Sequence, residues 1–409
     1  MQPTKSHKTT RAKAGASHPS VALLTNAPAP YRTPFLNELA RHCRLLVLFD
    51  TMREPGREWD VDEQAFEFEW RLTRTLSLSR NIGRHRSADR PVLHLPFNVA
   101  STLNRFQPDV VVSLELGART ASAAAFCRVR RRPLIVWWEG TPHSEIAIGT
   151  LKANVRRSLL RHATRAWGNG DESAKSLAEY GFPSSHIDLG MTGIDTARFN
   201  RAVNDARATT RTALRERLGI HGVVLLFVGS LSSRKGLQEL LAALTLLAED
   251  PGLPDWSALF VGSGPLAENV KAWAHAHPSV PVALPGFVQP SELPQFFAAS
   301  DLFVMPSLED VWGMVCLEAL VAGLPQVTSS LAGAASALVT SAEIGTVVDP
   351  TDTRALADQL ASRIRLGPQL VPEAVRGAAM THWSPTTMAQ RAVSSITSSM
   401  PVPAAEIPR

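Results

Sequence analysis

Residues Asp301 to Pro325 are the most informative segment of the chain and read DLFVMPSLEDVWGMVCLEALVAGLP. Its first six residues are mostly apolar and predict a buried strand, and a helix is predicted to begin near Gly313. Two carboxylates, Asp310 and Glu318, lie eight positions apart, one in the loop and the other just over one turn into the helix. Both are therefore expected at the carboxyl end of a parallel strand, where open α/β sheets bind ligands.

The start of this predicted helix also suits a phosphate group. Backbone N–H groups point outward there, and the positive end of the helix dipole favours an anion. Carboxylates accept hydrogen bonds from sugar hydroxyls, so the combination suits a nucleoside-diphosphate sugar. A solvent-exposed acidic loop is the alternative interpretation, and packing explains Trp312 as well as function does.

The spacing of the two carboxylates resembles the E-x7-E motif of retaining glycosyltransferases of the GT-B fold, family 4 (glycosyl transferases group 1). Asp310 stands where the first Glu usually lies. The resemblance implies that Glu318 hydrogen-bonds the ribose hydroxyls of the donor and that Asp310 holds a hydroxyl of the transferred sugar. It further implies that the donor phosphate and sugar contact three backbone amides, those of Gly313, Met314 and Val315.

Length and composition favour a two-domain globular protein. The chain has 409 residues, of which 44% are hydrophobic and 19% charged, which is typical of globular proteins and long for a single core. No run of 18 apolar residues occurs, so no membrane span is expected. Three scattered cysteines indicate neither a disulfide framework nor a metal site, and they favour a reducing cytoplasm. The net charge of +5 is compatible with anionic partners.

The alternation of apolar runs with amphipathic stretches predicts an α/β protein with two Rossmann-like, doubly wound parallel-sheet domains. The GT-B resemblance implies that they face each other across a cleft. Strands are expected at Val21–Thr25, Leu45–Phe49, Val110–Leu114, Leu134–Trp138, Arg165–Gly168, Val223–Gly229, Ala258–Val261, Val282–Phe287, Leu302–Met305, Gln326–Thr328 and Thr346–Val348. In the first half, helices are expected at Thr33–His42, Ala147–His162 and Glu172–Tyr180, the last with Asp171 as N-cap.

The domain limits follow from this pattern. A basic tail is expected at 1–19, an acceptor-binding domain at 20–200 and a nucleotide-sugar-binding domain at 201–384, with the polar segment 195–211 as the linker. Residues 385–400 are predicted to form a last helix, which the resemblance implies returns to the first domain. The segment 401–409 is expected to be loose.

Residues 226–236 read LFVGSLSSRKG and resemble the family's "VGRL…KG" loop. Because a nucleoside diphosphate gains negative charge as it leaves, cations are needed here, and Lys235 is the first candidate with Arg234 assisting. Ser230 stands where the family usually has Arg, so either Arg234 takes over or the phosphate contact is weaker. An exposed Arg-Lys pair is the alternative, although cations are disfavoured at a helix start.

Two further segments resemble the donor half of the family. Residues 261–265, VGSGP, match a turn in which Gly262 and Gly264 let the backbone approach the nucleotide. Residues 285–288, PGFV, match a strand end at which Phe287 and Val288 border the base. No side chain there identifies the base.

The first half supplies the acceptor candidates. Residues 25–36, TNAPAPYRTPFL, resemble the first loop of a family-4 subgroup and make Arg32 a diphosphate or acceptor contact. Residues 137–145, WWEGTPHSE, place Glu139 where many relatives carry a cleft His, with His143 a short turn away. Glu139 is expected to stabilise oxocarbenium-like charge or act as acceptor base. Pairing with an Arg of the 156–165 cluster is the alternative.

We therefore expect a retaining, metal-independent glycosyltransferase with a nucleotide-sugar as substrate and no cofactor. Its acceptor is a glycan, a lipid-linked saccharide or a small molecule, in cell-surface polysaccharide or glycoconjugate biosynthesis, and no nucleic acid is expected as partner. Arg157, Arg161 and Arg165 are predicted to share a helix face that is either solvated or in peripheral contact with the inner side of the cell membrane. The alternatives are a nucleotide-sugar epimerase of the same fold and a catalytically weak partner subunit that binds nucleotide-sugar or glycan.

Overall fold

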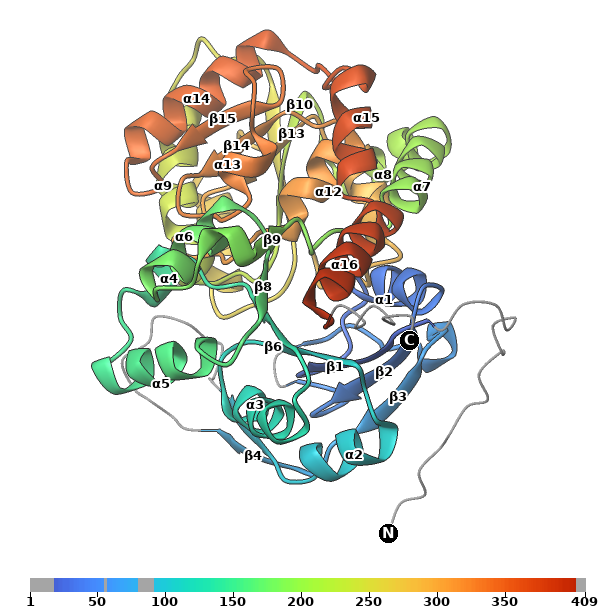
Figure 1. Cartoon of the computed structure of the whole chain (residues 1–409). Coiled ribbons are helices and arrows are strands. Elements are labelled where there is room, and N and C mark those ends of the chain that lie inside the picture. The colour runs from blue at the N-terminus through green and yellow to red at the C-terminus, as the bar shows by residue number, and fades with distance from the viewer. Residues whose placement is uncertain (1–17, 55–56, 80–91, 402–409) are drawn as a thin grey trace, which may run out of the picture.

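The computed structural model describes residues 18–54, 57–79 and 92–401. The chain forms two lobes, each a parallel sheet with helices on both faces (Figure 1). This confirms the predicted fold class. Most of the expected tails at 1–19 and 401–409 lies outside the described residues.

The N-terminal sheet has seven parallel strands in the order β3-β2-β1-β6-β7-β8-β9. Their bounds are β1 Ser20–Thr25, β2 Arg44–Phe49, β3 Glu69–Leu72, β6 Val110–Leu114, β7 Leu134–Trp138, β8 Arg165–Gly168 and β9 Ile187–Leu189. An antiparallel hairpin, β4 Thr75–Ser79 with β5 Val92–Pro96, accompanies this sheet. The helices are α1 Thr33–Ala40, α2 Val99–Phe106, α3 Ala118–Arg130, α4 Pro142–Glu145, α5 Thr150–Leu160 and α6 Asp171–Glu179, with short 3₁₀ turns η1 Glu63–Ala65 and η2 Ser184–His186.

The C-terminal sheet has six parallel strands in the order β12-β11-β10-β13-β14-β15. Their bounds are β10 Val223–Val228, β11 Trp256–Val261, β12 Val282–Gly286, β13 Leu302–Met305, β14 Gln326–Ser329 and β15 Gly345–Val348. The helical elements of this half are α7 Thr196–Thr209, α8 Arg211–Leu218, η3 Ser233–Lys235, α9 Leu237–Ala248, α10 Ala267–Ala276, α11 Leu293–Ala298, α12 Met314–Ala322, α13 Ala335–Leu338, α14 Thr353–Leu366, α15 Glu373–His382 and α16 Pro385–Ser399.

Helix α16 belongs to the core of the N-terminal lobe. Its apolar residues Met388, Ala389, Ala392 and Ile396 are buried in one cluster with Phe35 and Leu39 of α1. The indole N–H of Trp167 donates to Ser395 Oγ at 2.8 Å. Figure 1 shows α16 reaching down from the C-terminal lobe to α1, so the end of the chain ties the two lobes together.

Three sequence-based predictions of local structure are wrong. The segment 195–211 is no linker: Asp195 caps α7 through the Arg198 amide at 3.0 Å, and α8 begins at Arg211. The proposed domain boundary at 200 therefore falls inside α7. The predicted helix at 147–162 is present as the shorter α5, and Gly170, one residue before Asp171, is the N-cap of α6.

Candidate active site

The strand order of each sheet reverses at one point, and open α/β sheets bind ligands beside such a point. In the C-terminal sheet the reversal lies between β10 and β13, because β11 and β12 follow on one side and β14 and β15 on the other. The loop after β10 carries Lys235, and the loop after β13 carries Asp310. Both predicted donor residues thus flank the reversal point.

Lys235 and Asp310 form an ion pair between the Lys235 Nζ and an Asp310 carboxylate oxygen. The two side chains are only 17% and 11% exposed. Burial alone would raise the pKa of Asp310, but Lys235 and Arg234 outweigh it, and the net pKa lies below the usual value. Asp310 is therefore ionised at neutral pH and holds the ammonium group of Lys235 between the loops that follow β10 and β13.

Gly236 permits this ion pair by letting the two loops touch. Its φ is +67°, and a Cβ added there would lie 1.7 Å from the carbonyl oxygen of Pro306. The Leu308 amide donates to the Arg234 carbonyl at 2.9 Å, and Arg234 Nη1 donates to the Glu309 carbonyl at 3.2 Å. The Arg234 guanidinium thus lies against the same loop as Asp310.

Gly262 and Gly264 serve a second contact between loops. Their φ angles are +146° and +156°, and a Cβ on either would lie 1.9 Å from the Gly229 carbonyl or 2.5 Å from that of Leu231. The loop after β11 therefore needs both glycines in order to pack on the loop after β10. Protein packing already accounts for these glycines, whether or not a ligand also approaches them.

The N-terminus of α12 begins at Gly313, which is the N-cap with a φ of +95°. This positive φ favours glycine at the turn, and a Cβ there would also lie 2.9 Å from Met305 Cε. The first helical turn leaves the amides of Met314 and Val315 without a helical acceptor. They remain available to an anion beside Lys235 and Asp310.

Glu318 lies one turn into α12 and is half-buried. Its carboxylate has no hydrogen-bond or ion-pair partner among the described residues, and burial raises its pKa to about 7. Phe287 and Val288 follow the end of β12 and are also half-buried, and Val288 packs against the core of this lobe. The Glu318 carboxylate is therefore free to accept hydrogen bonds from a ligand.

In the N-terminal lobe, Arg32 donates a hydrogen bond to Glu139 at 2.8 Å. The guanidinium lies 5.3 Å from the ring centre of Tyr31 and 5.4 Å from that of Trp137. Burial alone would lower the pKa of Arg32, but Glu139 raises it, and the net pKa is above its usual value. Asn169 adds a longer contact to Glu139 at 3.5 Å.

The predicted partner of Glu139 in the 156–165 cluster is therefore wrong. Arg156 is buried, pairs with Glu145, and lies 4.8 Å from the Trp138 ring centre. Arg165 lies in β8 and pairs with Asp188 at 2.7 Å, so it does not share a helix face with Arg157 and Arg161.

His143 connects the two lobes. Its Nε2 lies 2.8 Å from the Leu308 carbonyl oxygen. A carbonyl only accepts hydrogen bonds, so Nε2 carries a hydrogen and cannot act as a base in this conformation. Trp312 is buried and packs at 5.0 Å between ring centres on Trp383, so packing explains it.

Beside His143 lies a cavity of about 520 Å³ between the lobes. Helices α4 to α6 line one side, and the loop 330–333 lines the other. Its Gly333 amide donates to the Asp310 carbonyl at 3.0 Å, and a Cβ at Gly333 would lie 2.2 Å from the Val311 carbonyl oxygen. Sequence analysis missed this loop, whose small residues after a buried strand were the available signal.

Comparison with known proteins shows which family and which folds this chain resembles. Residues 211–370 match the model of the family Glycosyl transferases group 1. The chain is 32% identical to D-inositol 3-phosphate glycosyltransferase 2 of Catenulispora acidiphila over 242 residues, which cover 56% of this chain and 55% of that protein. It is 33% identical to mannosylfructose-phosphate synthase of Agrobacterium fabrum over 165 residues, 37% of this chain and 34% of that protein.

Among solved structures, HepE of Anabaena in complex with UDP has a TM-score of 0.72. The two proteins are 19% identical, and the match covers 93% of this chain and 100% of HepE. Residues 211–370 thus resemble the glycosyl transferases group 1 family, and the two-lobed fold matches that of GT-B glycosyltransferases. The chain spans about half or less of the length of the two curated relatives.

The loop contact at Gly236 generates a stability prediction. Gly236→Ala should destabilise the protein through both the left-handed φ, which costs about 1–2 kcal/mol, and overpacking against Pro306, which costs about 1–3 kcal/mol more. The matched control is Gly219→Ala at the end of α8, where φ is +64° but no atom lies within 4 Å of the added Cβ. Calorimetry should show a larger drop in melting temperature for Gly236→Ala. Equal drops would mean that the loop contact does not constrain the fold.

Proposed function

We propose that the protein is a retaining glycosyltransferase that moves a sugar from a nucleoside-diphosphate sugar to a hydroxyl group of an acceptor. The single observation that carries this proposal is the Lys235–Asp310 ion pair beside the free amides of α12. The bond between the anomeric carbon and the phosphate breaks, and the nucleoside diphosphate leaves with the electron pair. The acceptor oxygen bonds to the same face of the sugar and releases its proton to the departing phosphate.

Lys235, Arg234 and the amides of Met314 and Val315 would stabilise the charge that grows on the leaving group. We therefore propose that the reaction needs no metal ion and no cofactor. Glu318 would accept hydrogen bonds from the ribose hydroxyls, and Asp310 from a hydroxyl of the transferred sugar. Arg234 lies against the same loop as Asp310, which supports its taking the part of the Arg that Ser230 replaces.

Glu139 and Arg32 form the proposed acceptor side of the reaction. Their pair lies just beyond the carboxyl ends of β1 and β7. We propose that the Glu139 carboxylate faces the anomeric centre while Arg32 holds it in position. His143 would help to hold the lobes together, because its Nε2 is engaged by the Leu308 carbonyl.

The names of the relatives guide the choice of substrates to test. HepE has been crystallised with UDP-glucose, and a relative of 32% identity acts, by its name, on an inositol phosphate. We therefore propose UDP-glucose as the first donor to test. Glycans, lipid-linked saccharides and small polyols are the acceptor classes, within cell-surface polysaccharide or glycoconjugate biosynthesis.

We also propose that the protein works in the cytoplasm, in peripheral contact with the membrane. No helix among residues 18–54, 57–79 and 92–401 is long and apolar enough to cross a bilayer. Ile146 and Leu151 are 77% and 78% exposed around the start of α5, next to the exposed cations Lys152 and Arg157. Apolar and cationic side chains together suit an anionic lipid surface, and co-sedimentation with vesicles of anionic lipid tests the contact.

Lys235→Ala should lower the turnover number by about 100-fold and the donor affinity much less, because the charge on the diphosphate grows in the transition state. The assay follows UDP release from UDP-glucose in the presence of EDTA, with NMR of the product's anomeric carbon. Lys271→Ala, which removes an exposed lysine paired with Glu268 at 2.8 Å, is the matched control.

Retention of the α configuration and full activity in EDTA are the expected results. An inverted product, or activity restored only by a divalent ion, would refute the mechanism. A sugar epimer formed without acceptor would identify an epimerase, and nucleotide binding without UDP release would indicate a partner subunit.

Glu318 should make nucleotide binding depend on pH. Its pKa is about 7, so it is largely protonated below pH 7 and ionised above it. Ribose hydroxyls donate to the ionised carboxylate, so UDP affinity should rise by up to about tenfold between about pH 6 and pH 8. UDP itself titrates in this range, and Glu318→Gln supplies the baseline. If the two proteins show the same pH profile by calorimetry, Glu318 does not bind the ribose.

Glu139→Gln should leave Arg32 charged and unpaired, which lowers stability by about 1–3 kcal/mol for a pair that is not fully buried. The double variant Arg32→Gln/Glu139→Gln removes the uncompensated charge and should recover part of the melting temperature. Transfer should stay severely reduced in both variants. If transfer recovers together with stability in the double variant, Glu139 is only a structural partner of Arg32.

A further inference from the structure

The N-terminal sheet reverses its strand order in the same way as the C-terminal sheet. The reversal lies between β1 and β6, because β2 and β3 follow on one side and β7 to β9 on the other. The loop after β1 carries Arg32, and the residue directly after β6 is Glu115. By topology Glu115 occupies the place that Asp310 has in the donor lobe.

Glu115 has a backbone conformation that its side chain does not favour. Its φ is +64°. Only two other non-glycine residues of the described part of the chain have a positive φ, and both close helices: Gln107 ends α2 and Arg131 ends α3. A left-handed residue is common at a helix end. Glu115 instead follows a strand, so capping does not explain it.

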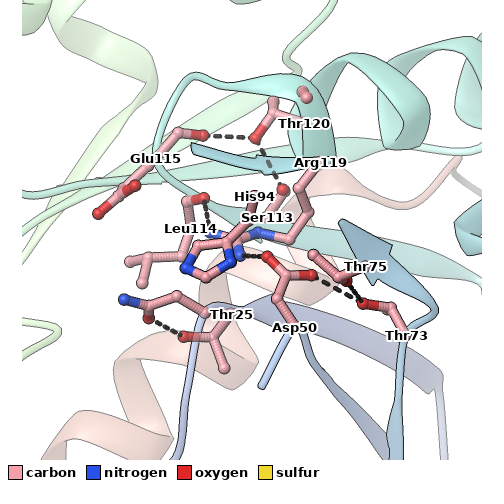
Figure 2. Close-up of polar contacts among 12 residues, drawn as sticks. Thr25, Asp50, Thr73, Thr75, His94, Ser113, Leu114, Glu115, Arg119 and Thr120 are labelled. Atoms are coloured by element: carbon pink, nitrogen blue, oxygen red, sulfur yellow. Dashed lines mark hydrogen bonds and ion pairs between the residues drawn. The ribbon is translucent and has the colours of Figure 1, made fainter. Parts of the chain in front are cut away.

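A network of buried polar groups holds this conformation in place (Figure 2). The Glu115 amide donates to the Trp137 carbonyl at 2.8 Å, and its carbonyl accepts from Thr120 Oγ1. Arg119 Nη2 donates to the Leu114 carbonyl at 2.9 Å, one residue earlier.

Arg119 is itself fixed by a buried ion pair with Asp50, which also accepts from Thr73 Oγ1 at 2.9 Å. Several hydrogen bonds and the buried ion pair together hold Glu115 in its unfavourable backbone conformation. Such strain clusters at functional sites.

The carboxylate of Glu115 takes no part in this network. In Figure 2 the side chain extends away from Thr120 and Arg119. It is exposed and has no hydrogen-bond or ion-pair partner among the described residues. Glu115 follows β6, which lies between β1 and β7, and the loops after those two strands carry Arg32 and Glu139. In the donor lobe Lys235 neutralises Asp310, whereas here Arg32 pairs with Glu139 and leaves Glu115 free.

We infer that Glu115 is an acceptor-binding residue, whose carboxylate accepts a hydrogen bond from a hydroxyl of a neutral sugar bound at the reversal point between β1 and β6. This inference rests on the proposed function for the identity of the second substrate. A neutral polyol suits the position because an unpaired carboxylate repels anions and accepts hydrogen bonds from hydroxyls. The positive φ of Glu115 sets the direction of its side chain, and the buried polar network keeps the backbone in that conformation.

The test compares Glu115→Gln, Glu115→Gly and the control Arg131→Gly, which relieves a left-handed residue at a helix end. Binding of methyl glycosides of glucose, galactose and mannose is measured by saturation-transfer NMR, with and without UDP-glucose. The affinity of the wild-type protein for at least one glycoside should exceed that of Glu115→Gln by about tenfold or more, the loss of one charged hydrogen bond. Glu115→Gly should lose glycoside binding to the same extent while its melting temperature rises, and Arg131→Gly should bind as the wild type does.

Unchanged glycoside affinity in Glu115→Gln would overturn the inference. So would a wild-type protein that binds none of the three glycosides, or a Glu115→Gly variant with a lowered melting temperature. Failure of the proposed function appears elsewhere, as an absence of binding when UDP, GDP and ADP are each titrated into the wild-type protein. Glu115→Gln is expected to keep the wild-type affinity for UDP-glucose, because Glu115 lies on the lobe opposite the donor loops.

Discussion

The ion pair between Lys235 and Asp310 joins the two chain segments that build the proposed donor site. Neither charge could be held so far from water without the other, because an unpaired buried charge is costly. The pair forms only because Gly236 lets one loop press against the Pro306 carbonyl of the other. The α12 amides lie beside it for the same reason, since the second loop leads directly into Gly313. A cation, a carboxylate and free amides are thus brought to one point by a contact between two backbones.

The two lobes share one topology but use it differently. In both, loops on either side of the strand reversal carry a basic and an acidic residue. The donor lobe pairs them with each other and places the Arg234 guanidinium against the same loop. The N-terminal lobe pairs Arg32 with Glu139 and leaves Glu115 unpaired on a strained turn. This division suits a charged donor on one side and a neutral acceptor on the other.

The sequence was sufficient for the elements that are buried on both faces. The strands at Val110–Leu114 and Leu134–Trp138 have the predicted bounds, because a continuous apolar run marks a central parallel strand. Helix α7 was missed because it lies on the surface, and only Thr196 and Val203 of its residues are buried. A polar helix of this kind carries a weak periodic signal.

Only those site residues that lie close together in the sequence could be predicted as a group. Neighbouring residues such as Arg234, Lys235 and Gly236 act within one loop, and their spacing carries the information. The partner of Glu139 is Arg32, which lies 107 positions away, and charge alone could not choose it among the many arginines. The conformation of Glu115 leaves no trace in the sequence, because a buried network assembled from β2, β6 and α3 imposes it.

The measurement that tests the account most directly is calorimetric titration of the wild-type protein with UDP, GDP and ADP at low and high salt. If the loops after β10 and β13 form a diphosphate site, at least one nucleotide should bind in a one-to-one complex. Its affinity should fall as salt screens Lys235 and Arg234. If none of the three binds at either salt concentration, the donor site proposed at the strand reversal does not exist.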